Sequence, residues 1–387
     1  MKQALFTYID NHKEEMLSFW EDLVTTESGS DNIEGVNKVS EKIRVLLETA
    51  GAKVTLKSFP NAGNMLIAHF DGGNKAPVLF LGHMDTVFKK GTLVRHPFVI
   101  KDGLAYGPGI LDMKAGLTIA CFLAKAFTAV GYKDRPLKIV FAGDEENAHP
   151  HSNAPQIIMK EAKGCVAAFN FETGFEDNSF VLGRKGTAIF KLTVTGIGAH
   201  AGNNPEQGRS AILEMAHKII DIQNLTDFKK GYSFNVGTIQ GGTVFNAIPD
   251  YCEVYVDIRY LDPATVPDLK AKVMAIAAKN YVQGTKTEVI DFHIGLNAMQ
   301  ITEASKQLFS VFAKTCVEND FGTASSKLVG GGSDSAYTIM AGVPTICAVG
   351  AKGKNNHTSL EYALVDSLFE RAKLVGAMVL KLSEFEK

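Results

Sequence analysis

A histidine and an aspartate two residues apart follow an apolar run near residue 80 and could form part of a metal site. The run Pro77–Leu81 is typical of a buried strand, and His83 and Asp85 come directly after it. Because alternate residues of an extended segment point the same way, the two side chains can share one side. The Asp85 carboxylate could then accept the imidazole N–H while the other ring nitrogen binds a metal ion. A satisfied polar pair at a strand end is the alternative, so the hypothesis requires matching ligands elsewhere.

Matching side chains do occur beyond other predicted elements of the chain. Strands are predicted at 137–142, 166–171 and 344–350, and an apolar helix at about 113–130. The side chains beside these elements are Glu145 and Glu146, Glu172, His357, and Asp112 at the start of the helix. The carboxyl ends of parallel strands meet at one edge of an open sheet, where ligands bind. Any one of these acids could simply open a helix, but four coincidences at four strand ends favour a metal site. Mixed imidazole and carboxylate ligands suit zinc, with cobalt or manganese as substitutes.

The elements that would position these residues alternate between strands and helices. This alternation predicts an α/β fold, with a mostly parallel sheet and helices on both of its faces. The amino terminus opens as one amphipathic helix, and a second helix is predicted from about Asp31 to Ala50. The stretch Asp102–Gly109 is rich in turn residues and predicts an irregular crossing.

The middle of the chain follows a different order. Strand, helix, strand, strand, helix and strand are predicted in turn at 188–195, 209–225, 232–239, 251–260, 263–279 and 287–293. The order β-α-β-β-α-β is that of a ferredoxin-like α+β sandwich. We therefore expect an inserted domain at 184–294 between two parts of one catalytic domain, 1–183 and 295–387.

Charge and composition exclude several function classes. The net charge is −2 and the pI about 6.6, so the chain lacks the basic field that nucleic acid or an anionic membrane would need. No apolar run reaches membrane-spanning length, and the amino terminus lacks a signal-type apolar core. The five cysteines are scattered and odd in number, which is typical of reduced thiols. A cytoplasmic location is expected.

Three stretches together resemble a known family. Leu81–Phe88, Tyr106–Gly116 and Asp144–Glu146 are similar to the motifs of the zinc exopeptidase and deacylase family. That family includes glutamate carboxypeptidase, succinyl-diaminopimelate desuccinylase, acetylornithine deacetylase and aminoacylase, and the glutamate carboxypeptidase branch is the most similar. The resemblance covers nearly the whole chain. It implies that the inserted domain pairs two chains into a homodimer.

The resemblance also implies roles for the candidate ligands. Two zinc ions per chain would be bridged by Asp112, and Co²⁺ or Mn²⁺ could replace them. One ion would be completed by His83 and Glu172, and the other by Glu146 and His357. Glu145 would be the general base, which takes a proton from metal-activated water and hands one to the leaving amine. Asp85 would orient His83.

Further residues match positions that meet the substrate in that family. His200, in the loop Gly196–Gly202, would reach the partner subunit's active site and donate a hydrogen bond to the oxyanion. The remaining substrate-binding candidates are Asn246, Arg259, Gly331 and Gly332. Three of these features have a simpler interpretation: His200 as a turn histidine, Arg259 as an exposed strand residue, and the glycines as a tight turn before a helix.

Two segments depart from the family pattern. After Glu146 the chain continues Asn147–His151 in place of a small Gly/Ser-rich loop, and we expect His149 and His151 at the surface, or else narrowing the pocket. The segment His293–Ala298 lacks the arginine associated with glutamate release, which argues against a carboxy-terminal glutamate preference.

The sequence thus predicts a two-zinc hydrolase that releases an amino acid from a small peptide or N-acyl amino acid. Carboxypeptidase-like action is favoured. An N-acyl-amino-acid deacylase or a small-peptide aminopeptidase is the second hypothesis. A catalytically silent peptide-binding relative is the third, and retention of Glu145 with every ligand argues against it. A nicotinamide dehydrogenase is excluded, because Gly107-Pro108-Gly109 follows no suitable strand and lacks a third glycine.

Overall fold

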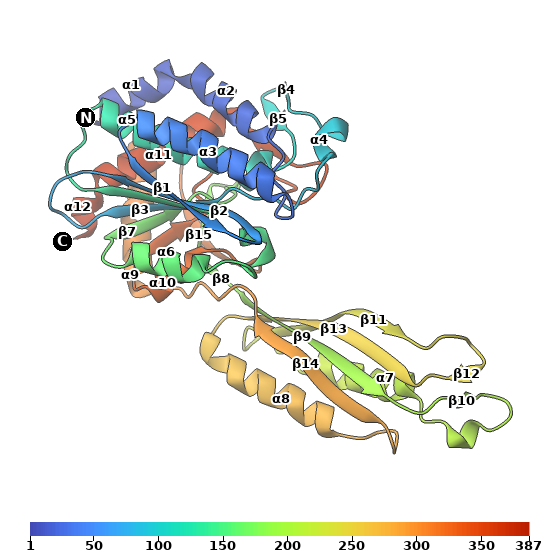
Figure 1. Cartoon of the computed structure of the whole chain (residues 1–387). Helices are drawn as coiled ribbons and strands as arrows, with labels where there is room; N and C mark the ends of the chain where they lie inside the picture. The colour runs from blue at the N-terminus through green and yellow to red at the C-terminus, as the bar shows by residue number, and fades with distance from the viewer. Residues whose placement is uncertain (387) are drawn as a thin grey trace. The chain divides into compact units, whose positions relative to one another are not determined.

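An eight-stranded sheet organises the first of two units into which the chain divides (Figure 1). The structure is a computed structural model, and it describes residues 1–386. The first unit contains residues 1–183, 301–328 and 334 onward. The second contains residues 184–300 together with the short segment 329–333. The sequence did not predict that this short segment joins the second unit.

The centre of the large sheet is parallel and its margins are antiparallel. In spatial order the strands are β1 (Lys53–Phe59), β2 (Ala62–Phe70), β6 (Leu137–Ala142), β3 (Val78–His83), β7 (Ala167–Asn170), β16 (Thr345–Cys347), β8 (Ser179–Arg184) and β15 (Ser325–Val329). β6, β3, β7 and β16 run parallel to one another, whereas β1, β2 and β8 pair antiparallel. Every residue of β3 is buried, as expected for a strand covered on both faces. The predicted fold class is confirmed, and the carboxyl ends of the four central strands share one edge.

Helices cover both faces of this sheet (Figure 1). On one face lie α1 (Lys2–Asn11), α2 (Lys13–Val24), α3 (Ile33–Thr49), α5 (Gly116–Ala129) and α11 (Val365–Leu380). On the other lie α6 (Ala154–Ala162), α9 (Glu303–Glu318) and α10 (Ser335–Met340), and α12 (Leu382–Phe385) follows α11. The sequence predicted one helix at the amino terminus, and this prediction is wrong. The structure has two helices there, α1 and α2, which are separated at His12. α3 begins after Asn32, whose side chain accepts the backbone N–H of Gly35 as an N-cap.

A small second sheet beside the large one brings distant loops together. Its strands, in spatial order, are β17 (Gly353–Lys354), β18 (Tyr362–Leu364), β5 (Leu104–Tyr106) and β4 (Val99–Lys101), and the short helix α4 (Thr92–Arg95) precedes β4. The sequence predicted only an irregular crossing at 102–109. The pairing of β5 with β18 sets the segment before Asp112 beside the hairpin that carries His357.

The second unit has the predicted β-α-β-β-α-β order. Its elements are β9 (Gly186–Thr195), α7 (Ala211–Gln223), β11 (Ser233–Gly241), β13 (Tyr251–Tyr260), α8 (Val266–Ala278) and β14 (Lys286–Ile294), with the turns η3 (Pro205–Gln207) and η4 (Pro263–Thr265). The sheet order is β11-β13-β9-β14, and all three pairings are antiparallel. β10 (Ala199–His200) and β12 (Ala247–Ile248) pair separately. α7 and α8 contact each other and close an apolar core over the sheet.

The sequence also bears on membrane-spanning segments and on the state of the cysteines. None of the helices in the described part of the chain has the length and apolarity needed to cross a bilayer. All five cysteines are buried free thiols.

Candidate metal centre

The five predicted metal ligands come from the ends of strands or from the turns beside them. His83 is the last residue of β3, and Glu146 lies in the turn η2 (Glu145–Asn147) after β6. Glu172 follows β7 by two residues. Asp112 lies in the turn η1 (Ile110–Ala115) that leads into α5, and His357 lies between β17 and β18. The parallel centre of the large sheet and the β17–β18 hairpin thus bring these side chains together.

These side chains form two groups that share one carboxylate. In the first, His83 Nε2 lies 3.3 Å from Asp112 Oδ1 and 3.9 Å from Glu172 Oε1. In the second, His357 Nε2 lies 3.2 Å from Asp112 Oδ2 and 3.3 Å from Glu146 Oε2. Asp112 turns one oxygen toward each group. This arrangement is what two cations bridged by one carboxylate require, although the role of each residue as a ligand stays a prediction.

Several polar atoms in this cluster lack a hydrogen-bond partner among residues 1–386. They are His83 Nε2, Asp112 Oδ1 and Glu146 Oε1. His83 and Asp112 are also buried. Buried polar atoms without partners are costly and rare in folded proteins. Because these orphaned atoms belong to side chains of the two ligand groups, the residues present fit a pair of metal ions.

The pKa values in the cluster show how protons on the histidines can balance the negative charge of the carboxylates without metal ions. Burial alone would lower the pKa of His83, but the carboxylates of Glu145 and Asp112 raise it well above its usual value. Hydrogen bonds to Asp112 and Glu146 raise the pKa of His357 to about 11. Protons on both histidines thus neutralise neighbouring carboxylates. Divalent cations would supply that positive charge and release the protons.

Glu145 lies beside the ligands without belonging to either group. Its carboxylate is buried, and Oε2 lies 4.0 Å from His83 Nε2. Burial raises the pKa of Glu145 well above its usual value, and the neighbouring carboxylates of Glu172 and Asp334 add to the rise. A carboxylate with a raised pKa is suited to accept and return a proton.

Asp85 supports this centre in a different way from the one predicted. The Nδ1–H of His83 donates to the backbone carbonyl of Asp85 at 3.0 Å, whereas the carboxylate Oδ1 lies 3.4 Å from Nδ1. The carboxylate instead accepts the backbone N–H groups of Glu145 and Glu146, both at 3.1 Å, and the Ser30 hydroxyl at 2.7 Å. Asp85 therefore fixes the His83 ring through its main chain and the two glutamates through its side chain.

Glu361 is a supporting residue that the sequence did not reveal. Its carboxylate accepts three backbone N–H groups at the start of η1, from Leu111 at 2.8 Å, Asp112 at 2.9 Å and the preceding Gly109 at 3.3 Å. Burial raises the pKa of Glu361 to about 8. Asn356 adds a hydrogen bond of 3.0 Å from its amide to Asp112 Oδ2. No motif marks Glu361, because it acts on a turn some 250 residues earlier in the chain.

The prediction that His149 lies at the surface is wrong, and the alternative that it narrows the pocket stays a prediction. Its ring is buried, with Nδ1 at 2.8 Å from Asp144 Oδ1 and Nε2 at 2.6 Å from Asp334 Oδ1. The two aspartates outweigh burial and raise the pKa of His149 well above its usual value. His149 therefore links the turn before Glu145 to the start of α10. His151 is exposed, as expected.

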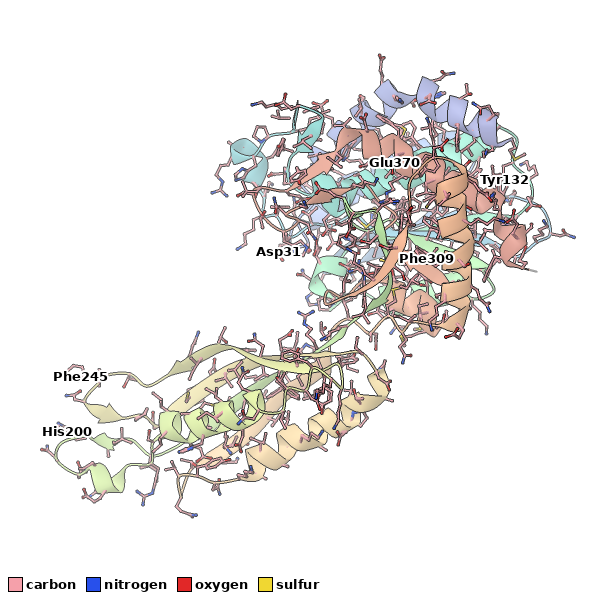
Figure 2. All side chains as sticks on the ribbon, turned by 180° about the vertical axis from the view of Figure 1, so that it is seen from behind. Asp31, Tyr132, His200, Phe245, Phe309 and Glu370 are labelled. Atoms are coloured by element: carbon pink, nitrogen blue, oxygen red, sulfur yellow. The ribbon has the colours of Figure 1, made fainter. Side chains whose placement is uncertain are left out.

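The other predicted site residues belong to the second unit. His200 is exposed, and its Nδ1 accepts the backbone N–H groups of Gly202 and Asn203, both at 3.1 Å. Because Nδ1 is occupied as an acceptor, the ring proton must sit on Nε2. Asn246 is also exposed, and its carbonyl accepts the N–H of Ala201. Figure 2 shows His200 at the same end of this unit as Phe245.

Arg259 and the glycine segment also lie in the second unit. Arg259 Nε donates to Asp257 at 2.8 Å, and Nη1 donates weakly to the Gly330 carbonyl at 3.4 Å. The carbonyls of Gly331 and Gly332 accept from Arg184 Nη1 at 3.3 and 3.2 Å. Contact of these residues with a substrate stays a prediction.

Comparison with known proteins supports the predicted family. Residues 182–285 match the model of a peptidase dimerisation domain. The chain is 27% identical to carboxypeptidase G2 of Pseudomonas sp. (strain RS-16), over 98% of this chain and 92% of that protein. It is also 27% identical to a succinyl-diaminopimelate desuccinylase of Hydrogenovibrio crunogenus, over 86% of this chain and 89% of that protein. Among solved structures, aminopeptidase PepT of Bacillus cereus matches with a TM-score of 0.81 at 21% identity, covering 96% of this chain and 99% of that one. The last likeness shows the fold.

Proposed function

We propose that this chain, which is similar to carboxypeptidase G2 and to a succinyl-diaminopimelate desuccinylase and contains a peptidase dimerisation domain, is an M20-family two-zinc hydrolase of small peptides or N-acyl amino acids. Its action would release an amino acid in the manner of a carboxypeptidase. The observation that carries the proposal is the pair of ligand groups joined through Asp112, with the buried Glu145 beside them. Two histidines and three carboxylates form a donor set that suits zinc, with Co²⁺ or Mn²⁺ as substitutes.

The ligands divide into two sites. His83 and Glu172 would hold one ion, Glu146 and His357 would hold the other, and Asp112 would hold both. Two bound divalent cations supply Lewis acidity at the scissile carbonyl and lower the pKa of a water molecule. Asp85 and Glu361 keep the ligand-bearing turns in place through the backbone hydrogen bonds described above.

Glu145 carries the proton through the reaction. Its carboxylate accepts a proton as the water oxygen bonds to the carbonyl carbon. It then returns the proton to the amide nitrogen as the C–N bond breaks, leaving a carboxylic acid and an amine. Burial raises the pKa of Glu145, which favours a carboxylate that holds the proton between the two transfers.

His200 would donate a hydrogen bond to the negatively charged oxygen in the partner subunit's site. Its Nε2–H is directed by the two N–H groups that occupy Nδ1. The second unit offers a surface for pairing two chains. α7 exposes Ile212, Leu213 and Ile220 beside the edge strand β11, which exposes Ile239. An exposed apolar strip beside the free edge of a sheet, such as that of β11, is typical of an interface between protein chains.

Substrate selection would involve the second unit as well. The Arg259 guanidinium is a suitable donor for a carboxylate, and Asn246, Gly331 and Gly332 would meet the substrate's polar atoms. The lack of an arginine in 293–298 argues against a terminal glutamate held by that segment, so a glutamate preference would need a different cation. The buried free thiols fit a reducing compartment such as the cytoplasm.

An N-acyl-amino-acid deacylase is the second candidate, because a desuccinylase matches this chain with the same identity as carboxypeptidase G2. A screen of dipeptides and N-acyl amino acids with zinc or cobalt added would separate the two. Turnover of peptides alone supports the carboxypeptidase, and turnover of acyl amino acids alone supports the deacylase. A metal-replete chain without turnover on either class would contradict the proposed function and favour a silent binding protein.

A further inference from the structure

A cavity of about 290 Å³ in the first unit takes no part in the mechanism above. Phe88, Pro97 and Tyr106 contribute an apolar and partly aromatic lining. Pro108, four residues before Asp112, and Thr358, directly after His357, also line it. The cavity therefore lies beside the two loops that carry Asp112 and His357. Its volume is near the lower limit for ligand pockets, so it suits one side-chain-sized group rather than a whole peptide.

The same cavity is lined by basic side chains without acidic ones. Arg95, His96 and Lys101 contribute to the lining, and no aspartate or glutamate does. Neither Arg95 nor Lys101 forms an ion pair anywhere in residues 1–386. Some basic residues of the first unit are paired, for example Lys138 with Glu161 and Lys352 with Glu370, whereas Arg95 and Lys101 are exposed at the mouth of this cavity. The cavity thus holds positive charge that the protein itself does not neutralise.

We propose that this cavity is a subsite for a substrate group that carries a carboxylate on an apolar or aromatic stem. The inference rests on the proposed function. The stem would pack against Phe88 and Tyr106, and the carboxylate would meet Arg95 and Lys101. Arg95 is the better partner for a carboxylate, because its planar guanidinium can donate two parallel hydrogen bonds. Two parts of a substrate could bring this chemistry: the acyl group, or the side chain of the amino acid that is released.

Matched substrate pairs separate these two sources. N-succinyl-alanine and N-butyryl-alanine differ in a carboxylate on the acyl side. N-acetylglutamate and N-acetylglutamine differ in one on the amine side. For one of these two pairs, we expect the wild-type enzyme to have a higher kcat/KM for the substrate with the additional carboxylate than for its uncharged counterpart. Arg95→Gln should reduce that preference about tenfold, equivalent to about 1.4 kcal/mol, mainly through KM. Lys101→Gln should act in the same direction, and Lys163→Gln, an exposed lysine outside the cavity, should leave the preference as in the wild type.

The outcomes distinguish this subsite from the proposed function. Amide hydrolysis with no preference in either pair, or with a preference that Arg95→Gln does not alter, would overturn the subsite and leave the hydrolase intact. If no substrate is turned over, binding of 3-phenylpropionate and its amide to the metal-free protein tests the cavity by itself. Tighter binding of the acid that Arg95→Gln abolishes would support the subsite, and equal binding would overturn it.

Discussion

The two units of this chain hold their functional polar residues in opposite ways. In the first, the ligands other than His357 are largely buried, and Asp85 and Glu361 fix the turns that carry them. In the second, His200 and Asn246 are exposed, and only main-chain contacts hold the His200 ring. Under the proposed function, the bond-breaking chemistry would therefore be contained in the first unit. The second unit would present His200 as a hydrogen-bond donor for a site outside itself. Substitutions in the two units should differ in their effects on metal content and rate.

The largest effect is expected from the two adjacent glutamates of the first unit. Glu145→Gln should retain both metal ions and lower kcat by roughly 10²–10⁴-fold, because proton transfer alone is removed. Glu146→Gln should weaken one metal site in addition, because its carboxylate belongs to the group with Asp112 and His357. Elemental analysis and steady-state kinetics on both variants provide the comparison. Metal loss in Glu145→Gln with full occupancy in Glu146→Gln would reverse the two assignments.

A second-unit substitution should lower the rate without affecting the metals. His200→Ala should lower kcat by about 10²–10³-fold, the usual effect of losing one oxyanion donor, and change KM less. Mixing inactive His200→Ala and Glu145→Gln chains under subunit exchange should restore one working site in each hybrid dimer. A mixture that stays inactive, with hybrids shown to form, would exclude a role for His200 in the partner subunit.

A substitution that prevents dimerisation should lower kcat as much as His200→Ala does. Ile220 is 59% exposed on α7, and Ile220→Glu would place a charge in the proposed interface. We expect the dimer dissociation constant to rise about 30-fold or more, equivalent to about 2 kcal/mol. At concentrations where the variant is monomeric, kcat should fall to the level of His200→Ala. Met274→Glu, similarly exposed on α8, is the control. Sedimentation velocity measures the association of both variants. If Ile220→Glu and Met274→Glu both form dimers like the wild type, the proposed interface is wrong.

The smallest effect on the rate, and a clear one on stability, is expected at His149. His149→Gln leaves the buried Asp144 and Asp334 without their shared cation, and should lower the free energy of unfolding by roughly 3–5 kcal/mol. Because the folded pKa of His149 is raised above its unfolded value, its stabilisation is complete below about pH 6.5. It is lost as the pH rises through the folded value. Urea unfolding at a series of pH values from 6 upward should therefore show a difference between wild type and variant that shrinks once the pH passes the folded pKa of His149. A pH-independent difference would contradict the ion pair.

Residues near one another in sequence were predicted well, and contacts between distant segments were not. The apolar runs before His83, Glu145 and Glu172 define parallel strands, so their shared edge follows from pattern alone. His149 depends on Asp334, 185 residues later, and Glu361 on a turn some 250 residues earlier. No local pattern encodes either pairing. The surface prediction for His149 failed for that reason, since a polar loop residue is buried only when a distant partner meets it.

Metal content of the Asp112→Asn variant tests the shared-ligand centre most directly. Asp112 is the one predicted ligand common to both groups. After dialysis against zinc, the wild type should hold two ions per chain, and Glu172→Gln should weaken one site. Asp112→Asn should weaken both, and wild-type activity should disappear on complete chelation and return with zinc. Two tightly held ions in Asp112→Asn, or wild-type turnover that survives complete chelation, would contradict the account.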